Sequence, residues 1–343
     1  MRHADILALT PAGLFCPAGG FHLDPTRAVD RALITHGHSD HARAGHDKVL
    51  ATRETLDIMA LRYGPNFAAS QQVAAYGESL QIGAAQVTFH PAGHVLGSAQ
   101  IAIEAGGLRA VVSGDYKREP DPTCALFEPI ACDIFVTEAT FGLPVFRHPP
   151  SPGEIAKLLA SHALFPERAH LVGVYPLGKA QRVMALLRQA GYERPLFIHG
   201  ALEKLTDYYV SRGIALGEVR LVAQADRAKL AGEIVLCPPS ALNDLWSRKF
   251  PDPVTAFASG WMRVRARARQ RGVELPLVIS DHAGWDELCA TILATGCAQL
   301  LVTHGEAEAL VHWAGTCGLA AKPLHLLGYG DEEAEAPVTE AAQ

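Results

Sequence analysis

The sequence predicts an α/β protein made of two parts, and three observations support this prediction. Short apolar runs repeatedly end in a single polar residue, as residues 134–136 do just before Glu138. Between about residues 149 and 260, stretches of strand and helix character alternate, which is typical of a parallel α/β unit. Four prolines, at 144, 149, 150 and 152, separate this region from the chain before it.

Strands of the first part are expected at residues 32–34, 49–52, 86–90, 100–104, 108–113 and 133–137. Gly106-Gly107 is a hairpin turn between two of them. A helix is expected at residues 55–63, ending at Gly64-Pro65, and another from His41 onward. Open α/β sheets place their sites at the carboxyl ends of strands, so the polar residues that follow these strands are expected to lie close together.

The second part is expected to hold strands at residues 170–174, 196–199, 233–237 and 254–258, with helices at 178–190 and 202–210. The chain then returns to the first part. A strand is expected at 277–279, a helix at 285–294, a strand at 300–302 and a last helix at about 306–313.

Composition places the chain among globular proteins. It has 343 residues, of which 49% are hydrophobic. No apolar run reaches the roughly 18–20 residues of a membrane helix, and no signal peptide is recognised, so a cytoplasmic protein without membrane contact is expected. Its seven cysteines are odd in number and never spaced C-x-x-C, which favours reduced thiols over disulfides or a thiolate zinc site.

Residues 35–41 read T-H-G-H-S-D-H and follow the strand expected at 32–34. Neutral imidazole nitrogens and carboxylate oxygens are ligands that suit Zn²⁺ and similar first-row ions. In a tight turn the H-x-H pair can point at one ion and the following Asp-His pair at a second. A chance histidine-rich loop is the alternative.

This segment resembles the signature of the metallo-β-lactamase superfamily. Its remaining ligand positions are matched by His94 in residues 91–98, Asp115 in residues 111–115 and His304 in residues 301–306, each after an expected strand. Residues 137–142 (T-E-A-T-F-G), 173–181 (G-V-Y-P-L-G-K-A-Q) and 279–283 (I-S-D-H-A) are similar to segments of the β-CASP nucleases. The motifs cover nearly the whole chain in the order of that branch.

The resemblance implies a four-layer αββα metallo-β-lactamase sandwich with an inserted α/β β-CASP cap domain. The expected boundaries are 1–148 for the first part of the metallo-β-lactamase domain, 149–260 for the cap, 261–330 for the return and 331–343 for a disordered acidic tail.

By the same resemblance, one ion is held by His36, His38 and His94, and the other by Asp40, His41 and His304, with Asp115 bridging them. Zn²⁺ is expected, with Mn²⁺ as an alternative. Asp40, Glu138 and His282 form the expected catalytic set, in which a hydroxide shared by the ions attacks a phosphodiester and His282, oriented by Glu138, is the general acid. Asp24 either orients a ligand or forms a turn before Pro25.

A net charge of −6 is unusual for a nucleic-acid-binding protein, so a local basic strip is needed. Such a strip follows Trp261, and an extended backbone would place its arginines on one face: Arg263, Arg265, Arg267, Arg269 and Arg271. The alternative is a solvated edge. Lys179 and Gln181 are expected near a helix N-terminus, either as phosphate contacts or as ordinary surface residues.

Residues 14–20, 260–265 and 280–282 resemble those of bacterial ligase-associated DNA damage response exonucleases. That resemblance implies a DNA exonuclease of DNA repair, associated in function with an ATP-dependent DNA ligase and a helicase. An RNA-processing β-CASP nuclease, of the mRNA 3′-end-processing or ribonuclease J-like kind, is the alternative favoured by histidine at 304. A third interpretation is a metal hydrolase that acts on small molecules, but it does not explain the cap or the basic strip. A catalytically silent scaffold would leave the ligand set without purpose.

Overall fold

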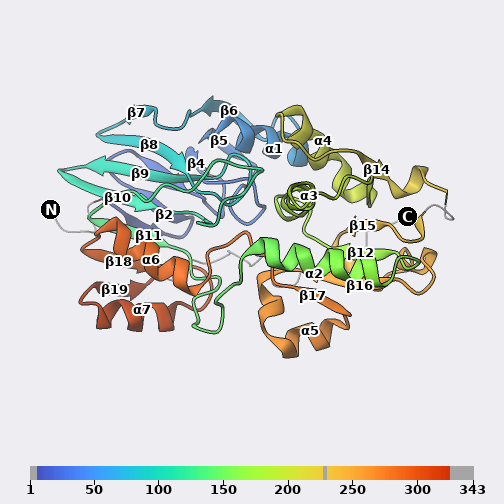
Figure 1. Cartoon of the computed structure of the whole chain (residues 1–343). Helices are drawn as coiled ribbons and strands as arrows, with labels where there is room; N and C mark the ends of the chain where they lie inside the picture. Colours follow the sequence, from blue (N-terminus) through green and yellow to red (C-terminus); the bar gives the residue numbers. More distant parts are fainter. Residues whose placement is uncertain (1–5, 227–229, 325–343) are drawn as a thin grey trace. The chain divides into compact units, whose positions relative to one another are not determined.

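The computed structural model describes residues 6–226 and 230–324, which form two compact units (Figure 1). Within the described residues, unit 1 comprises residues 6–144 and 282–324, and unit 2 comprises residues 145–226 and 230–281. The acidic tail expected at 331–343 lies outside the described residues.

The expected return to the first part at residue 261 is wrong, because the chain re-enters unit 1 only at His282. The reason is a strand pairing: β17 (Leu275–Leu277) runs parallel to β16 (Val254–Ala258) in the sheet of unit 2. The basic strip therefore belongs to unit 2, as do residues 145–148.

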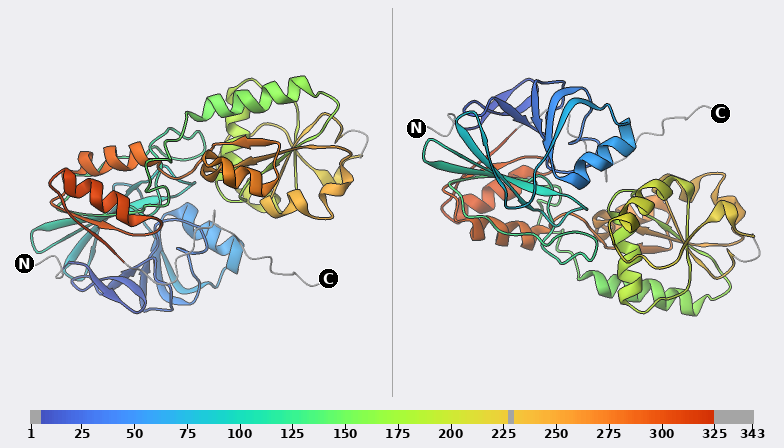
Figure 2. Two further views of the ribbon diagram at one scale, coloured as in Figure 1. Left: turned by 90° about the horizontal axis from the view of Figure 1, so that it is seen from below. Right: turned by 90° about the horizontal axis from the view of Figure 1, so that it is seen from above.

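Unit 1 contains two sheets (Figure 2). The first has strand order β1-β2-β3-β4-β5-β6, with bounds Ala8–Thr10, Gly13–Cys16, Phe21–Leu23, Arg31–Leu33, His46–Ala51 and Ala68–Val73. The second has order β19-β18-β11-β10-β9-β8-β7, with bounds Ala320–Pro323, Gln299–Val302, Ile134–Thr137, Leu108–Val112, Ala99–Ala105, Ala85–Pro91 and Ser79–Ile82.

Alternation along the strands creates three apolar layers in unit 1. Leu33 of β4 and Val136 of β11 point into the core between the two sheets. Ala32 of β4 packs in a second cluster with α1 (Arg53–Tyr63). Phe135 of β11 packs in a third with α6 (Trp285–Thr295) and α7 (Ala307–Thr316). Unit 1 is therefore a four-layer α/β/β/α sandwich.

Unit 2 is built on one sheet of parallel strands in the order β14-β13-β15-β12-β16-β17. The strands not yet given are β12 (His170–Gly173), β13 (Leu196–Ile198), β14 (Val219–Leu221) and β15 (Ile234–Cys237). Its helices are α2 (Ser151–Leu164), α3 (Lys179–Gln189), α4 (Glu203–Ser211) and α5 (Arg265–Arg271). The expected strands at 170–174, 196–199, 233–237 and 254–258 are present as β12, β13, β15 and β16, whereas β14, β17 and α5 were not expected in this unit.

The helix expected from His41 onward is not formed. The amides of His41 and Ala42 both donate to the carbonyl of His38, which makes a tight turn. Gly45 then takes a left-handed backbone (φ 97°) and leads directly into β5. The turn keeps all ligand-type side chains of this segment near the end of β4.

All seven cysteines are free thiols. Among residues 6–226 and 230–324, no helix combines the length and the apolar character that crossing a bilayer requires.

Candidate metal centre

The histidines and carboxylates singled out in the sequence meet at one edge of the sandwich in unit 1. The loop after β4 brings His36, His38, Asp40 and His41, and the loop after β8 brings His94. Asp115 follows β10, Glu138 follows β11 and His304 follows β18. Since β10, β11 and β18 are neighbouring parallel strands, their carboxyl ends deliver three of these side chains to the same place.

The first donor group comprises His36, His38, His94 and Asp115, whose ligand atoms all lie within 4.8 Å of one another. His94 Nε2 is 3.0 Å from His38 Nδ1, and His36 Nε2 is 3.3 Å from Asp115 Oδ2. All four side chains are buried. Three imidazoles and one carboxylate converging in this way are a donor set that Zn²⁺ accepts.

The second donor group comprises His41, Asp115 and His304, again with ligand atoms within 4.8 Å. His41 Nε2 lies 3.4 Å from Asp115 Oδ2 and 3.6 Å from Asp40 Oδ2, so Asp40 adds a second carboxylate. The same oxygen of Asp115 approaches His36, His41 and His94, the last at 3.9 Å. Asp115 is therefore common to both groups.

Burial favours neutral imidazoles in the first group. It lowers the pKa of His36 to about 3 and that of His94 well below 6.5, with nearby histidines adding to the effect. Burial likewise lowers the pKa of His304 to about 4. Neutral imidazoles offer the lone pairs that metal ions require.

The second group carries excess negative charge. Burial disfavours a charge on His41, but the carboxylates of Asp115 and Asp40 outweigh it and raise the pKa of His41 well above 6.5. Burial also opposes the charge of Asp115, yet His41 keeps the pKa of Asp115 well below 3.8. A proton on His41 thus balances part of the negative charge of Asp40 and Asp115, and a divalent cation, with twice that charge, would balance more of it.

A buried nitrogen in the first group also fits a metal ion. His36 Nε2 makes no hydrogen bond within the part of the chain that the structure describes, although His36 is fully buried. An unsatisfied buried polar atom costs roughly 1–3 kcal/mol, and coordination of an ion removes that cost. The residues present therefore fit two divalent ions.

Backbone strain is concentrated at the same place. Only three non-glycine residues among those described have positive φ, and two of them, Asp24 (φ 42°) and His304 (φ 56°), belong to this centre. Such conformations cost of order 1–3 kcal/mol and persist where the surroundings enforce them. The strained backbone at His304 turns its side chain toward His41, with ring centroids 5.1 Å apart.

Glu138 and His282 form a pair beside the two donor groups. His282 Nδ1 is 2.9 Å from Glu138 Oε2, and the amide of Tyr116 donates to Glu138 Oε1 at 2.7 Å. Both side chains are buried, and burial raises the pKa of Glu138. Together with Asp115, the pair has ligand-type atoms within 4.8 Å, so His282 faces the space where the donor groups meet.

Asp24 lies behind the ligands and accepts a hydrogen bond from His41 Nδ1 at 2.8 Å. Of the two sequence interpretations of Asp24, this geometry matches the one in which it orients a ligand.

Lys179 and Gln181 lie at the start of α3 as expected, but not on its surface, so the alternative in which they are ordinary surface residues is wrong. Both are fully buried. Lys179 Nζ is 3.3 Å from Asp281 Oδ2. Gln181 accepts from the amide of Gly178 and donates to Thr206 Oγ1 and the carbonyl of Pro176. These side chains stabilise the start of α3 and are occupied by contacts within unit 2.

The basic strip is helical, so the expectation of an extended strand with five arginines on one face is wrong. A 3₁₀ turn at Gly260–Arg263 leads into α5, in which alternate residues point to different sides. Trp261 is only 8% exposed and packs edge-on against Phe146. The guanidinium of Arg267 lies 3.8 Å from the centre of the Trp261 ring. Trp261 therefore anchors α5 and is not an open stacking surface.

Sequence reasoning missed several supporting residues. Thr35 and Ser98 lie inside motifs that the sequence revealed, but only the structure shows that Ser98 Oγ accepts from the amide of His94. Lys117 Nζ bonds Glu287 Oε2 at 2.7 Å and joins the loop after Asp115 to the start of α6. The two residues are 170 positions apart, and nothing in the sequence pattern connects them.

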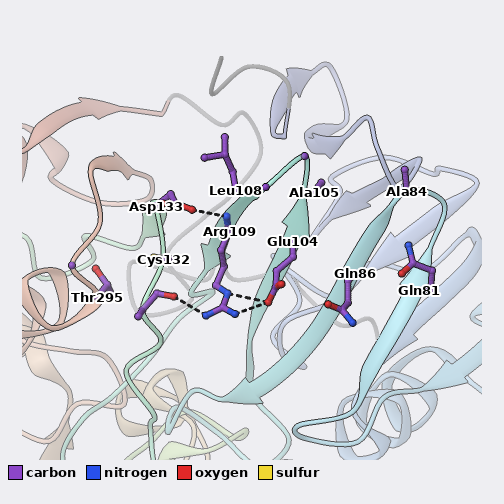
Figure 3. Close-up of a pocket in the computed structure, with 14 residues that line it drawn as sticks. Gln81, Ala84, Gln86, Glu104, Ala105, Leu108, Arg109, Cys132, Asp133 and Thr295 are labelled. Carbon is purple, nitrogen blue, oxygen red and sulfur yellow. Dashed lines mark hydrogen bonds and ion pairs between the residues drawn. The ribbon is translucent and has the colours of Figure 1, made fainter. Parts of the chain in front are cut away.

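A separate cavity of about 710 Å³ lies at the opposite end of β11 (Figure 3). Its one arginine, Arg109, is paired with Glu104 Oε1 at 2.7 Å and held at its backbone by Asp133. The cavity contains none of the ligand-type histidines, so it is distinct from the metal centre.

Comparison with known proteins gives the following similarities. No family model matches the sequence. A protein named "Probable DNA ligase" from Opitutus terrae is 31% identical over 305 residues, covering 85% of this chain and 28% of that protein. "Endoribonuclease ysh-1" from Neurospora crassa is 28% identical over 220 residues, covering 53% of this chain and 25% of the relative. The chain thus spans about a quarter of the length of these curated relatives.

One solved structure, a protein of unknown function from Enterococcus faecalis V583, superposes with a TM-score of 0.55. It is 12% identical, and the match covers 79% of this chain and 74% of that one, so it bears on the fold alone. Similarity to proteins named Ysh1 endoribonucleases, together with the order of the metal-ligand motifs, supports the metallo-β-lactamase superfamily and its β-CASP branch for this chain.

Proposed function

We propose that this protein is a hydrolytic nuclease that needs two divalent metal ions and removes nucleotides from DNA ends, as in DNA repair. The observation that carries the proposal is one carboxylate, Asp115, shared by two donor groups beside the Glu138–His282 pair. Two ions about 3.5–4 Å apart are the arrangement that many phosphodiester-cleaving enzymes use. Unit 2 would be the β-CASP cap.

In this proposal His36, His38 and His94 hold one ion, Asp40, His41 and His304 hold the other, and Asp115 bridges them. When bound, the ions would activate water and neutralise negative charge on the phosphodiester. Zn²⁺ is the expected ion from the histidine-rich donor set, and Mn²⁺ is the alternative.

The protein's own contribution to bond cleavage is a proton. His282 lies next to the donor groups without belonging to either, so it is placed to give a proton to the departing oxygen of the nucleotide. Glu138 holds its Nδ1, so Nε2 is the nitrogen that faces the substrate. The amide of Tyr116 in turn fixes Glu138.

The relative named "Probable DNA ligase" gives weak support to DNA as the substrate, because the match covers 85% of this chain but only 28% of that protein. Several fungal relatives named as endoribonucleases support a second candidate, RNA processing, as does histidine at 304. In either case the same residues would have the same roles. Functional association with a ligase and a helicase belongs to the DNA proposal.

The experiment compares one end-labelled strand made as DNA and as RNA, at matched salt, with Zn²⁺, Mn²⁺ or EDTA. The Asp40→Ala/His41→Ala variant is the control. Metal-dependent release of mononucleotides from DNA, absent in the variant, is the expected result. Preference for RNA would transfer the assignment to RNA processing, and the absence of cleavage of both strands by protein with two bound ions would refute a nuclease.

We further propose that α5 binds the phosphate backbone. Arg265 and Arg269 are exposed and lie four residues apart, hence on one face of the helix. Within residues 6–226 and 230–324 neither has a carboxylate partner, whereas Arg194 and Arg220 of the same unit pair with Glu233 and Glu218. Uncompensated arginines of this kind suit a polyanion.

The variant Arg265→Gln/Arg269→Gln is expected to weaken binding of a single-stranded oligonucleotide. If each arginine contacts one phosphate, the slope of log affinity against log salt should fall by about 1.4. Fluorescence anisotropy at several salt concentrations measures both quantities. Arg194→Gln/Arg220→Gln removes the same charge from paired positions and should leave the slope nearly unchanged, and equal effects of the two variants would contradict a role for α5.

A further inference from the structure

Behind the metal centre, Asp24 and Thr35 contact one histidine from each donor group. Thr35 Oγ1 donates to Asp24 Oδ2 at 2.6 Å, and the amide of Thr35 donates to Asp24 Oδ1 at 2.7 Å. His41 Nδ1 lies 2.8 Å from the same Oδ2, and His36 Nδ1 lies 3.0 Å from Thr35 Oγ1. All four side chains are buried.

The direction of each hydrogen bond follows from the number of hydrogens available. An ionised carboxylate only accepts, so His41 must carry its hydrogen on Nδ1. The single hydroxyl hydrogen of Thr35 is given to Asp24, so Thr35 Oγ1 can only accept from His36, which must also carry its hydrogen on Nδ1. In both rings Nε2 is therefore the nitrogen that faces Asp115. The distance to Asp115 Oδ2 is 3.3 Å from His36 Nε2 and 3.4 Å from His41 Nε2.

Thr35 also sets the approach of Asp115. Gly114, the residue before it, has φ 56°, and a Cβ atom there would come within 2.7 Å of the Cβ and Oγ1 atoms of Thr35. The backbone that carries the shared carboxylate thus lies directly against the Thr35 side chain. Thr35 therefore has three contacts around the metal centre. It contacts His36 of the first group, and it lies against the backbone that carries the shared Asp115. It also contacts Asp24, which orients His41 of the second group.

We propose that Thr35 and Asp24 act as one positioning unit that couples the two metal sites, so that loss of the Thr35 hydroxyl weakens metal binding at both. The inference rests on the proposed function only in assuming that the donor groups bind metal. Without Thr35 Oγ1, nothing accepts the hydrogen of His36 Nδ1 at this position, so the tautomer of His36 is no longer fixed. The same loss also takes away one of the hydrogens donated to the carboxylate of Asp24, and Asp24 then orients His41 less well.

The test measures metal binding in the full chain, without reference to nuclease activity. Wild type, Thr35→Val and Thr35→Ser are loaded with Zn²⁺, and the bound ions are counted by elemental analysis and titrated against a chelating dye. Loss of a hydrogen bond of this kind costs 10–100-fold in metal affinity. Thr35→Val is expected to show that loss at both sites, and Thr35→Ser, which keeps the hydroxyl, should bind as wild type does.

Thr295→Val is the matched control, because Thr295 is also buried in unit 1 and its hydroxyl bonds the carbonyl of Ile292. It should bind two ions with unchanged affinity. Asp24→Asn provides a second variant if Thr35→Val does not fold, and it should also weaken both sites.

Unchanged affinity in Thr35→Val, or weakening confined to one site, would overturn the coupling while leaving the proposed function intact. Failure of the wild-type protein to bind two ions would instead overturn the metal assignment itself. The two failures are therefore distinguishable.

Discussion

Replacing Asp115 with asparagine should remove both metal ions and nearly all hydrolytic activity. Its Oδ2 lies 3.3–3.9 Å from the Nε2 atoms of His36, His41 and His94, so it is the one ligand shared by both groups. The amide keeps the size of the side chain but removes the negative charge that two cations need. Since metal ions contribute several kcal/mol to such reactions, a fall in rate of at least about 10³-fold is expected.

The measurement for Asp115→Asn combines zinc content per chain with the rate of cleavage of a labelled oligonucleotide. Asp133→Asn is a suitable control, because Asp133 is exposed and bonds the amide of Arg109 at the other end of β11. It should keep both ions and full activity. Retention of two tightly bound ions in Asp115→Asn would show that the bridging role is wrong.

Replacing His282 with glutamine should lower kcat while leaving metal content unchanged. His282 is paired with Glu138 at 2.9 Å and is absent from the two donor groups that hold His36 and His304. Loss of a general acid typically lowers the rate by 10²–10⁴-fold. Glu138→Gln should also lower kcat, because the amide can still contact the imidazole but no longer stabilises its charge or fixes its tautomer.

A change of leaving group separates proton donation from other roles of His282. An aryl phosphodiester releases a phenolate that needs little protonation, whereas a nucleotide releases an alkoxide that needs a proton. His282→Gln should therefore cleave the aryl substrate at close to the wild-type rate and the oligonucleotide far more slowly. Equal losses on both substrates would mean that His282 positions the substrate or the metal centre instead.

Sequence patterns alone predict the α/β class of both units and the kinds of donor side chain at the candidate metal centre. Residues 134–136 form a continuous apolar run, which is typical of a strand buried on both faces, and in the structure Phe135 faces the helices and Val136 the inter-sheet core. The ligands of residues 36–41 come from one tight turn, so their proximity is local. Asp115, Glu138 and His304 could be predicted because each follows an apolar run at a strand end.

Local sequence patterns did not predict the boundary between the units, the helical conformation of the basic strip or the burial of Lys179. All three depend on contacts between segments that are distant in the sequence. The pairing of β17 with β16 keeps residues 261–281 in unit 2. Arginines at every second position suit a strand, yet Trp261 packs against Phe146 and the segment after it forms α5. Lysine is usually a surface residue, but Lys179 is buried and forms an ion pair with Asp281.

The hydrogen bonds that hold the ligand-type side chains could be seen only in the folded protein. Asp24 could be a turn residue or an orienting carboxylate, and only the folded structure shows its carboxylate 2.8 Å from His41 Nδ1. The sequence assigns no role to Thr35, although it lies in the motif. In the structure its hydroxyl contacts both Asp24 and His36. The physical reason is general: residue type and spacing state which atoms can bind a metal, whereas hydrogen-bond direction depends on neighbours that folding brings together.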